Sequence, residues 1–134
     1  MKFLIADDEQ AHQVALQRLL RSHGDCVTAT DGAQAVTLFR QALEAGEPFN
    51  AVFLDIRMPS MDGQEALTAI RKLEKERYGL SIDNRDYAVI IMATSLDDPQ
   101  SVTEAFLKGK CNGYINKPVT RELVEEKLRH HNLI

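Results

Sequence analysis

Short apolar runs alternate along this chain with longer stretches in which apolar residues recur every three or four positions. Short runs that stay mostly apolar are typical of strands buried in a parallel sheet, and the longer period is that of a helix. The runs predicted as strands cover residues 3–6, 26–29, 51–55, 88–93 and 113–116. Strands joined through helices pair in parallel with right-handed crossovers. The predicted fold class is therefore α/β, a doubly wound five-stranded parallel sheet with five helices.

Residues typical of helix ends frame the longer stretches. Asp62 followed three positions later by Glu65 is the pattern of a capping box, and Asp98–Pro99 places a capping acid before a proline in the first turn. The polar segment 78–86 predicts a long surface loop before the fourth strand. The helical residues expected to face the core are Leu16, Leu19, Leu20, Val36, Phe39, Ala42, Leu43, Leu67, Ile70, Leu73, Val102, Ala105, Phe106, Leu123, Val124 and Leu128.

Polar side chains stand at or just past the ends of four of the predicted strands. Asp7 and Asp8 follow the first strand, and Asp55 ends the third. Thr94 follows the fourth strand and Lys117 the fifth. Because the carboxyl ends of strands in such a sheet open onto one crevice, we expect these five side chains to meet there. Three carboxylates, a hydroxyl and an ammonium together suit a divalent cation and a phosphoryl group.

Composition narrows the classes of protein that this chain can belong to. Its 134 residues are close to the commonest domain size, so we expect one domain over residues 1–134 with no output domain. The net charge of −4 gives no general attraction to nucleic acid or to a membrane surface. No apolar stretch approaches the roughly 18 residues of a membrane span, and the first residues lack the zones of a signal peptide. Cys26 and Cys111 form neither a metal-type spacing nor a disulfide framework, which indicates a cytoplasmic protein.

The order and context of the polar residues resemble the receiver domain of two-component response regulators, of the type related to the chemotaxis regulator. The resemblance covers nearly the whole chain. A single motif of this kind would be weak evidence, but five in register, each at the end of the expected strand, are a strong signal. The motifs are Asp7–Asp8, Asp55 with Met58–Pro59 and Met61–Asp62–Gly63, Thr94, Tyr114 and Lys117–Pro118.

The resemblance implies a strand order of 2-1-3-4-5 and a place in phosphorelay signalling. Asp55 would accept a phosphoryl group from a sensor histidine kinase or a histidine phosphotransfer protein. Mg²⁺ would be bound by the side chains of Asp8 and Asp55 and by the backbone carbonyl of Arg57. Asp7 would act mainly through a metal-bound water. The protein would be no enzyme in the usual sense, because it would catalyse only its own phosphorylation and dephosphorylation.

The resemblance also assigns the remaining motifs. Thr94 and Lys117 would contact the phosphoryl oxygens, and the Lys117–Pro118 peptide bond would be cis. Tyr114 would be a switch that follows Thr94 inward on activation. In this family the residues two after the acceptor and two after the hydroxyl, here Arg57 and Leu96, tune how long the phosphoryl group lasts. Leu96 offers no acid or amide to orient water, so we expect a moderately long-lived phosphoryl group.

The sequence does not name the partners. A stand-alone regulator of this kind would act by switching a surface that binds a downstream protein, whose identity the sequence does not reveal. No direct contact with nucleic acid and no membrane insertion are expected. Nothing in the sequence demands dimerisation, so we expect a monomer or a weak dimer.

Three other interpretations stay open at this point. A phosphohydrolase with an aspartate nucleophile commonly has a second acid two residues later, where this chain has Arg57. A receiver-like fold could also serve as a protein-binding scaffold without phosphorylation. A flavin or nucleotide module would need a glycine-rich or hydroxyl-rich loop after the first strand, where Asp7–Asp8–Glu9 would repel a phosphate. Turnover of a generic phosphoester and Mg²⁺-dependent modification of Asp55 discriminate between these possibilities.

Several other residues are expected to have structural roles only. The run from Arg71 to Arg77 alternates in charge, which predicts a solvated helix face. His12 and His23 are expected to pack along the first helix. Cys111 is expected in a loop beside the last strand, where it could be exposed.

Overall fold

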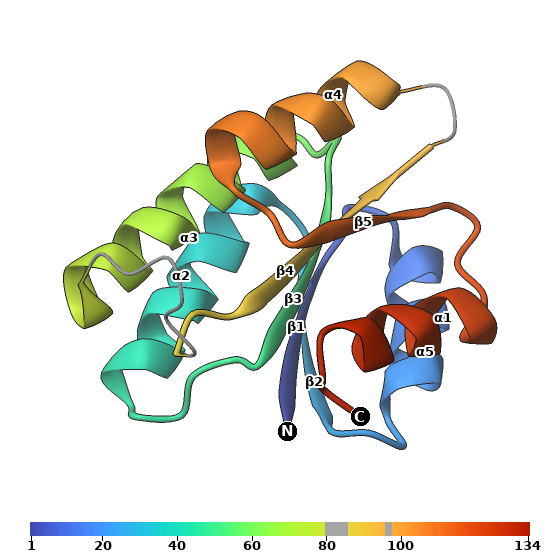
Figure 1. Cartoon of the computed structure of the whole chain (residues 1–134), viewed down its shortest axis with the longest axis horizontal. Helices are drawn as coiled ribbons and strands as arrows, with labels where there is room; N and C mark the ends of the chain where they lie inside the picture. Colours follow the sequence, from blue (N-terminus) through green and yellow to red (C-terminus); the bar gives the residue numbers. More distant parts are fainter. Residues whose placement is uncertain (80–85, 96–97) are drawn as a thin grey trace.

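The structure, a computed structural model, describes residues 1–79, 86–95 and 98–134. These residues form one parallel sheet with helices on both faces (Figure 1). The strands lie in the order β2-β1-β3-β4-β5, which confirms the doubly wound fold and the strand order that the resemblance implied. The strands are β1 (Lys2–Ala6), β2 (Asp25–Ala29), β3 (Ala51–Asp55), β4 (Val89–Thr94) and β5 (Gly113–Asn116).

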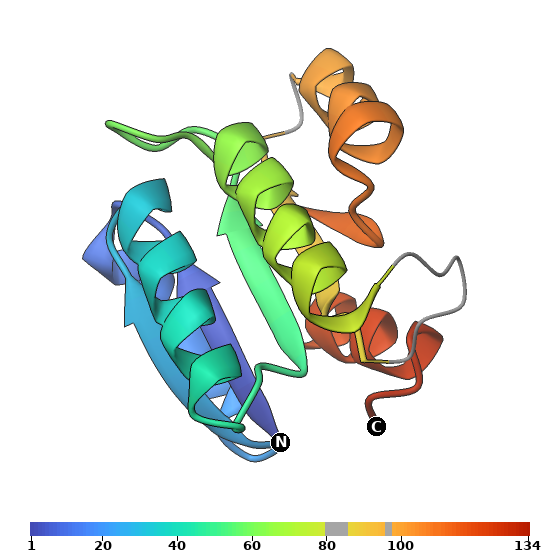
Figure 2. The same cartoon turned by 90° about the vertical axis from the view of Figure 1, so that its left-hand side faces the viewer.

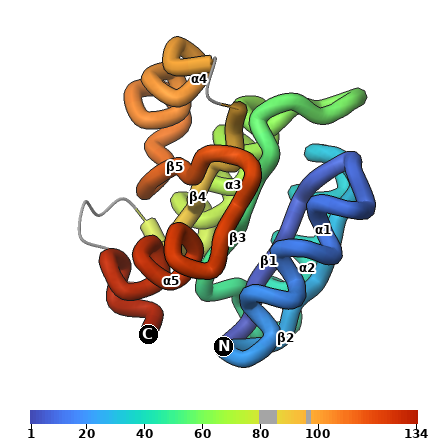
Figure 3. Tube along the Cα trace, turned by 90° about the vertical axis from the view of Figure 1, so that its right-hand side faces the viewer, coloured from blue at the N-terminus to red at the C-terminus, as the bar shows by residue number. Residues whose placement is uncertain are grey.

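Two layers of helices cover the sheet. One face is covered by α2 and α3 together with α4 and the segment that follows it (Figure 2), and the other by α1 and α5 (Figure 3). None of the helices in the described ranges is both long enough and apolar enough to span a bilayer. The helices are α1 (Gln10–Leu20), α2 (Gly32–Glu44), α3 (Gly63–Tyr78), α4 (Pro99–Glu104), the π-helix η1 (Ala105–Gly109) and α5 (Arg121–His130).

The central strands are buried on both faces, and this sets where their ends lie. In β1, Leu4 packs under α2 and α3, whereas Phe3 and Ile5 pack under α1 and α5. Such alternation follows from the two-residue period of a strand. In the register of the β1–β3 pair, Ala6 lies opposite Leu54. The acids that follow these two residues are therefore brought to the same edge of the sheet.

The start of α3 braces the end of β3. The Asp62 side chain accepts a hydrogen bond from the Glu65 amide, and the Glu65 side chain accepts one from the Asp62 amide, which confirms the predicted capping box. A Cβ atom on Gly63 would lie 2.3 Å from the backbone oxygen of Asp55. Only glycine fits at this close approach of two backbones. The loop after Asp55 is thereby held at a fixed distance from the strand.

The expectation that Phe106 faces the core is wrong. The Phe106 residue is 41% exposed, and its ring meets the edge of the Tyr114 ring with the centroids 6.4 Å apart. The reason is the change from α-helix to π-helix at Ala105. A π turn contains more residues than an α turn, so the inward positions become Ala105 and Gly109. The helical period of the sequence cannot reveal such a shift.

The expectation of a solvated face along α3 is wrong for Arg71 and Glu74. Glu74 is fully buried, and its Oε1 accepts a hydrogen bond of 2.6 Å from Arg71 Nη1. The other carboxylate oxygen accepts one from the Ala88 amide, and Arg71 Nη1 also donates to the Ala88 carbonyl. Burial raises the pKa of Glu74, and the charge and hydrogen bond of Arg71 oppose this rise. The pair ties α3 to the residue that precedes β4.

The same arginine also fixes the segment before β5. Arg71 Nε donates to the Lys110 carbonyl at 3.1 Å, and Nη2 donates to Asn112 Oδ1 at 2.7 Å. Cys111 lies between these two anchored residues, in the connection before β5 as expected, and it is only 7% exposed. Burial raises the pKa of the Cys111 thiol. Cys111 is therefore part of the core beside α3.

Candidate functional site

Three carboxylates gather at the carboxyl edge of the sheet. Asp7, Asp8 and Asp55 each offer one oxygen, and these oxygens lie within 4.8 Å of one another. Asp7 and Asp55 are buried, whereas Asp8 is exposed. Carboxylate oxygens are hard donors of the kind that Mg²⁺ prefers, and a partly exposed cluster leaves room for the waters that it retains. The donor set therefore fits a divalent cation.

Lys117 enters the same cluster from the far end of the chain. Its Nζ donates to Asp7 Oδ2 and to Asp55 Oδ2, both at 3.0 Å. The Lys117–Pro118 peptide bond is cis, as the resemblance implied. The ammonium pairs with two of the three carboxylates of the cluster, and the excess of acids is a further reason why the cluster suits a cation.

Burial and pairing act in opposite directions on the ionisation of this cluster. Burial raises the pKa of Asp55, and the charge of Asp7 adds to the rise, whereas the hydrogen bond and charge of Lys117 lower it. For Lys117, burial disfavours the ammonium, but the hydrogen bonds and charges of Asp55 and Asp7 outweigh it and raise the pKa. Lys117 therefore stays charged at neutral pH. The pair places a fixed positive charge beside the Asp55 carboxylate.

Thr94 borders the same cavity. A cavity of about 320 Å³ is lined by Asp8, Asp55, Thr94 and Lys117 among others. Thr94 ends β4, is 4% exposed, and donates its hydroxyl to the Ser95 carbonyl at 3.2 Å. The five residues predicted to meet at the carboxyl edge of the sheet are thus brought to one place.

Tyr114 lies apart from this cavity. It lines a neighbouring cavity of about 290 Å³ together with Thr94, Asp98 and Val102. The Tyr114 residue is 39% exposed, and Lys127 Nζ lies 5.6 Å from the centroid of its ring. Thr94 therefore stands between the acidic cluster and the tyrosine. An inward motion of the Tyr114 ring would need open space, and this cavity between Tyr114 and Thr94 provides it.

Arg57 reaches away from the carboxylates. Its backbone amide donates to Asp55 Oδ1 at 3.3 Å, but its largely exposed guanidinium pairs with Asp98 Oδ2 at 3.3 Å. Asp98 in turn caps α4 by accepting from the Ser101 amide. Hydrogen bonds from Ser101 and the nearby guanidinium of Arg57 lower the pKa of Asp98. Leu96, the other residue expected to tune the phosphoryl lifetime, lies outside the described residues.

Sequence reasoning missed His12. We expected it to pack along the first helix, but its Nδ1 lies 3.3 Å from Asp7 Oδ2 and 3.2 Å from Lys117 Nζ. The signal that could have found it is its place in the first turn of a helix that directly follows the acidic pair. A side chain one turn into that helix leans back toward the helix start.

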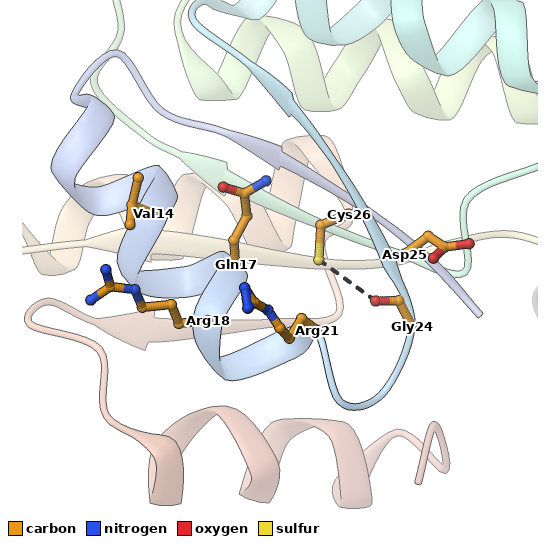
Figure 4. Close-up of a pocket in the computed structure, with 7 residues that line it drawn as sticks. All are labelled: Val14, Gln17, Arg18, Arg21, Gly24, Asp25 and Cys26. Carbon is orange, nitrogen blue, oxygen red and sulfur yellow. Dashed lines mark hydrogen bonds between the residues drawn. The ribbon is translucent and has the colours of Figure 1, made fainter.

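A separate hollow lies away from this cluster, between α1 and the edge strand β2. Figure 4 shows it with the Cys26 thiol 3.9 Å from the Gly24 carbonyl. Its volume is about 440 Å³, and none of the predicted site residues lines it. The lining residues are Val14, Gln17, Arg18, Arg21, Gly24, Asp25 and Cys26.

Comparison with known proteins decides the family. The sequence model of the response regulator receiver domain matches residues 3–129 of the chain. The chain belongs to this family. The resemblance stated from the strand-end motifs is thereby confirmed, and with it a place for this receiver domain in a phosphorelay.

Similar proteins include a kinase and two complexes. The receiver domain is 31% identical over 129 residues to the sensor histidine kinase GacS of Pseudomonas protegens, covering 96% of this chain and 13% of that kinase. It is 25% identical, with a TM-score of 0.77, to a chain in the complex of the Saccharomyces cerevisiae phosphotransfer protein Ypd1 with the Ssk1 receiver domain. The match covers 95% of this chain and 85% of that chain. It is 27% identical, with a TM-score of 0.80, to a chain in the CheX–CheY–BeF₃–Mg²⁺ complex of Borrelia burgdorferi. The match covers 98% of this chain and 89% of that chain.

Proposed function

We propose that this receiver domain accepts a phosphoryl group on Asp55, with Mg²⁺ held at the acidic cluster. The observation that carries the proposal is the Asp55 carboxylate in a cavity beside the Lys117 ammonium, with Asp7 and Asp8 within a few ångströms. A carboxylate is a weak nucleophile that repels an anionic phosphoryl group. Catalysis must therefore come from positioning and from neutralisation of charge, which these groups provide.

Each residue of the cavity would have a distinct role in the transfer. A carboxylate oxygen of Asp55 forms the new bond to phosphorus while the bond from phosphorus to the donor's imidazole nitrogen breaks and its electron pair stays on the imidazole. Lys117 transfers one hydrogen bond from Asp55 to a phosphoryl oxygen, and Thr94 turns its hydroxyl toward another. The cation would be bound by the side chains of Asp8 and Asp55 and the backbone carbonyl of Arg57, with Asp7 acting through water, and would neutralise phosphoryl charge.

The donor would be a sensor histidine kinase or a histidine phosphotransfer protein. The likeness to GacS and to a chain of the Ypd1–Ssk1 complex supports this choice. The output would be a partner-binding surface around α4, β5 and α5 that changes when Thr94 and Tyr114 move. The stand-alone arrangement, the cytoplasmic location, the downstream partner and the monomeric or weakly dimeric state stay predictions.

The proposal is tested by the intact mass of the protein after incubation with a small phosphodonor, with Mg²⁺ and with a chelator. The expected result is a single phosphoryl adduct that needs Mg²⁺ and is lost on standing, because an acyl phosphate is labile. No adduct in either condition would favour the scaffold interpretation. Many phosphates released per protein from a generic phosphoester would favour a phosphohydrolase instead.

Replacing Tyr114 with alanine should leave phosphorylation intact but uncouple it from the α4–β5–α5 surface. The aromatic ring is the group that would fill the space vacated by Thr94, and phosphorylation shifts the two states only through such differential contacts. Amide shifts measured by NMR on phosphorylation should reach Val102 and Phe106 in the parent and in Tyr114→Phe. They should stay confined to the site in Tyr114→Ala. Equal propagation in all three proteins would contradict a role for Tyr114.

A further inference from the structure

The Lys117 ammonium has three N–H donors, and the described part of the chain places three acceptors around it. Asp7 Oδ2 and Asp55 Oδ2 each lie 3.0 Å from Nζ, and His12 Nδ1 lies 3.2 Å away. A lysine ammonium can only donate hydrogen bonds, so all of its donors are satisfied by this set. Of these three acceptors, Asp55 alone is proposed to receive the phosphoryl group. The other two can therefore hold Lys117 while that transfer takes place.

The neighbours of His12 indicate which nitrogen faces the lysine. Because an ammonium cannot accept, Nδ1 must offer its lone pair to make an attractive contact with Lys117. The ring proton then lies on Nε2, which faces Glu9 Oε2 at 3.7 Å. Asp7 Oδ2 lies 3.3 Å from the same Nδ1, and Lys117 Nζ lies closer than this to both atoms, so a proton of the ammonium can point at each of them. We assign this tautomer from the hydrogen-bond neighbours.

The start of α1 fixes the place of the imidazole. Asp7 Oδ1 accepts from the Glu9 amide at 2.9 Å, and the His12 amide donates to the Glu9 carbonyl at 3.1 Å. The first turn of the helix is thus tied to the acid that follows β1. The His12 side chain is 41% exposed, so its packing into the core is slight. Its polar contacts are what distinguish it from an ordinary surface residue of α1.

We propose that His12 is a positioning residue that holds the Lys117 ammonium in place while its third hydrogen bond passes from Asp55 to the phosphoryl group. The proposal rests on the phosphoacceptor function argued above. A cation at the carboxylates competes with Lys117 for the oxygens of Asp7 and Asp55, because the cation would attract both carboxylates. His12 is the acceptor that a hard cation does not need, since Mg²⁺ favours oxygen ligands. His12 therefore stays hydrogen-bonded to Lys117 both without a bound cation and with one.

The test compares His12→Leu, which has no acceptor, with His12→Asn, whose side-chain oxygen can take the place of Nδ1. The first measurement is the solvent exchange of the Lys117 ammonium protons, followed by ¹H–¹⁵N NMR in the metal-free protein. Exchange should be at least about threefold faster in His12→Leu, because one N–H loses its acceptor, and close to parental in His12→Asn. Gln10→Leu, a polar-to-apolar change at an exposed position of the same turn, serves as the control and should leave exchange unchanged.

The second measurement is the rate of phosphorylation from a small phosphodonor with Mg²⁺. We expect His12→Leu to be about tenfold slower and His12→Asn to recover most of the rate, because a misplaced ammonium weakens charge stabilisation. Unchanged exchange in His12→Leu, or a slow His12→Asn despite normal folding, would overturn the proposal. A parent protein that forms no adduct would overturn the phosphoacceptor function instead, and the exchange measurement would still decide whether His12 holds Lys117.

Discussion

Replacing Asp55 with asparagine will abolish the Mg²⁺-dependent phosphoryl adduct. The amide of asparagine has nearly the shape of the carboxylate, but it cannot form an acyl phosphate because it lacks the anionic oxygen that attacks phosphorus. The substitution also keeps an oxygen that can accept from Lys117, which now donates to Asp55 Oδ2 at 3.0 Å. We therefore expect a folded protein whose intact mass stays that of the unmodified chain after incubation with the phosphodonor.

The matched control is Asp62→Asn, which changes an aspartate in the same connection without touching the cavity. Asn caps a helix about as well as Asp, so α3 should keep its start and the adduct should form at the parental rate. An adduct of undiminished yield in Asp55→Asn would place the acceptor on another side chain, with Asp8 the first to examine. Loss of the adduct in both variants would indicate a disturbed loop rather than a missing acceptor.

The site acids could be predicted from the sequence because they stand at the ends of strands. A short buried run fixes the direction of the chain, and a parallel sheet brings the ends of such runs to one edge. Asp7 and Asp55 follow paired residues of adjacent strands, so no side-chain detail was needed to place them together. The capping box at Asp62 was predictable for a similar reason, since its partners are three residues apart.

The missed features depend on contacts between distant parts of the chain or, for Phe106, on a change of helix type. His12 meets Lys117 across 105 positions, and its place in the first turn of α1 is the one local sign of that contact. The outward turn of Phe106 follows from a change of helix type that leaves the residue sequence looking α-helical. Arg71 and Glu74 were predicted to be solvated because their partners come from the segments before β4 and β5, far along the chain.

Replacing Arg71 with methionine will lower the free energy of unfolding at neutral pH by about 3–5 kcal/mol, because it leaves the carboxylate of Glu74 buried without its counter-ion. Glu74 is fully buried, and Arg71 donates to it at 2.6 Å. The variant also leaves the Ala88 and Lys110 carbonyls without the donor that now reaches them. Urea denaturation at neutral pH measures the loss as a lower midpoint with an unchanged slope.

Two controls separate the buried charge from other causes. Lys72→Met removes an exposed charge from the same helix and should change the free energy of unfolding by no more than about 0.5 kcal/mol. The double variant Arg71→Met/Glu74→Met removes both charges and should recover part of the loss, because an apolar pair needs no counter-ion. It should not recover all of it, because the Ala88 amide loses the carboxylate oxygen that it now donates to.

The pH dependence identifies the carboxylate as the source of the loss. Burial raises the pKa of Glu74 above its ordinary value, so its protonated form favours the folded state and the cost of its charge appears as pH rises through the folded pKa. Without Arg71, which opposes that rise, the folded pKa moves higher still. The difference in stability between the parent and Arg71→Met should therefore shrink as pH falls from 8 toward 5. A difference that stays constant over this range would mean that the arginine stabilises the fold through its backbone contacts alone.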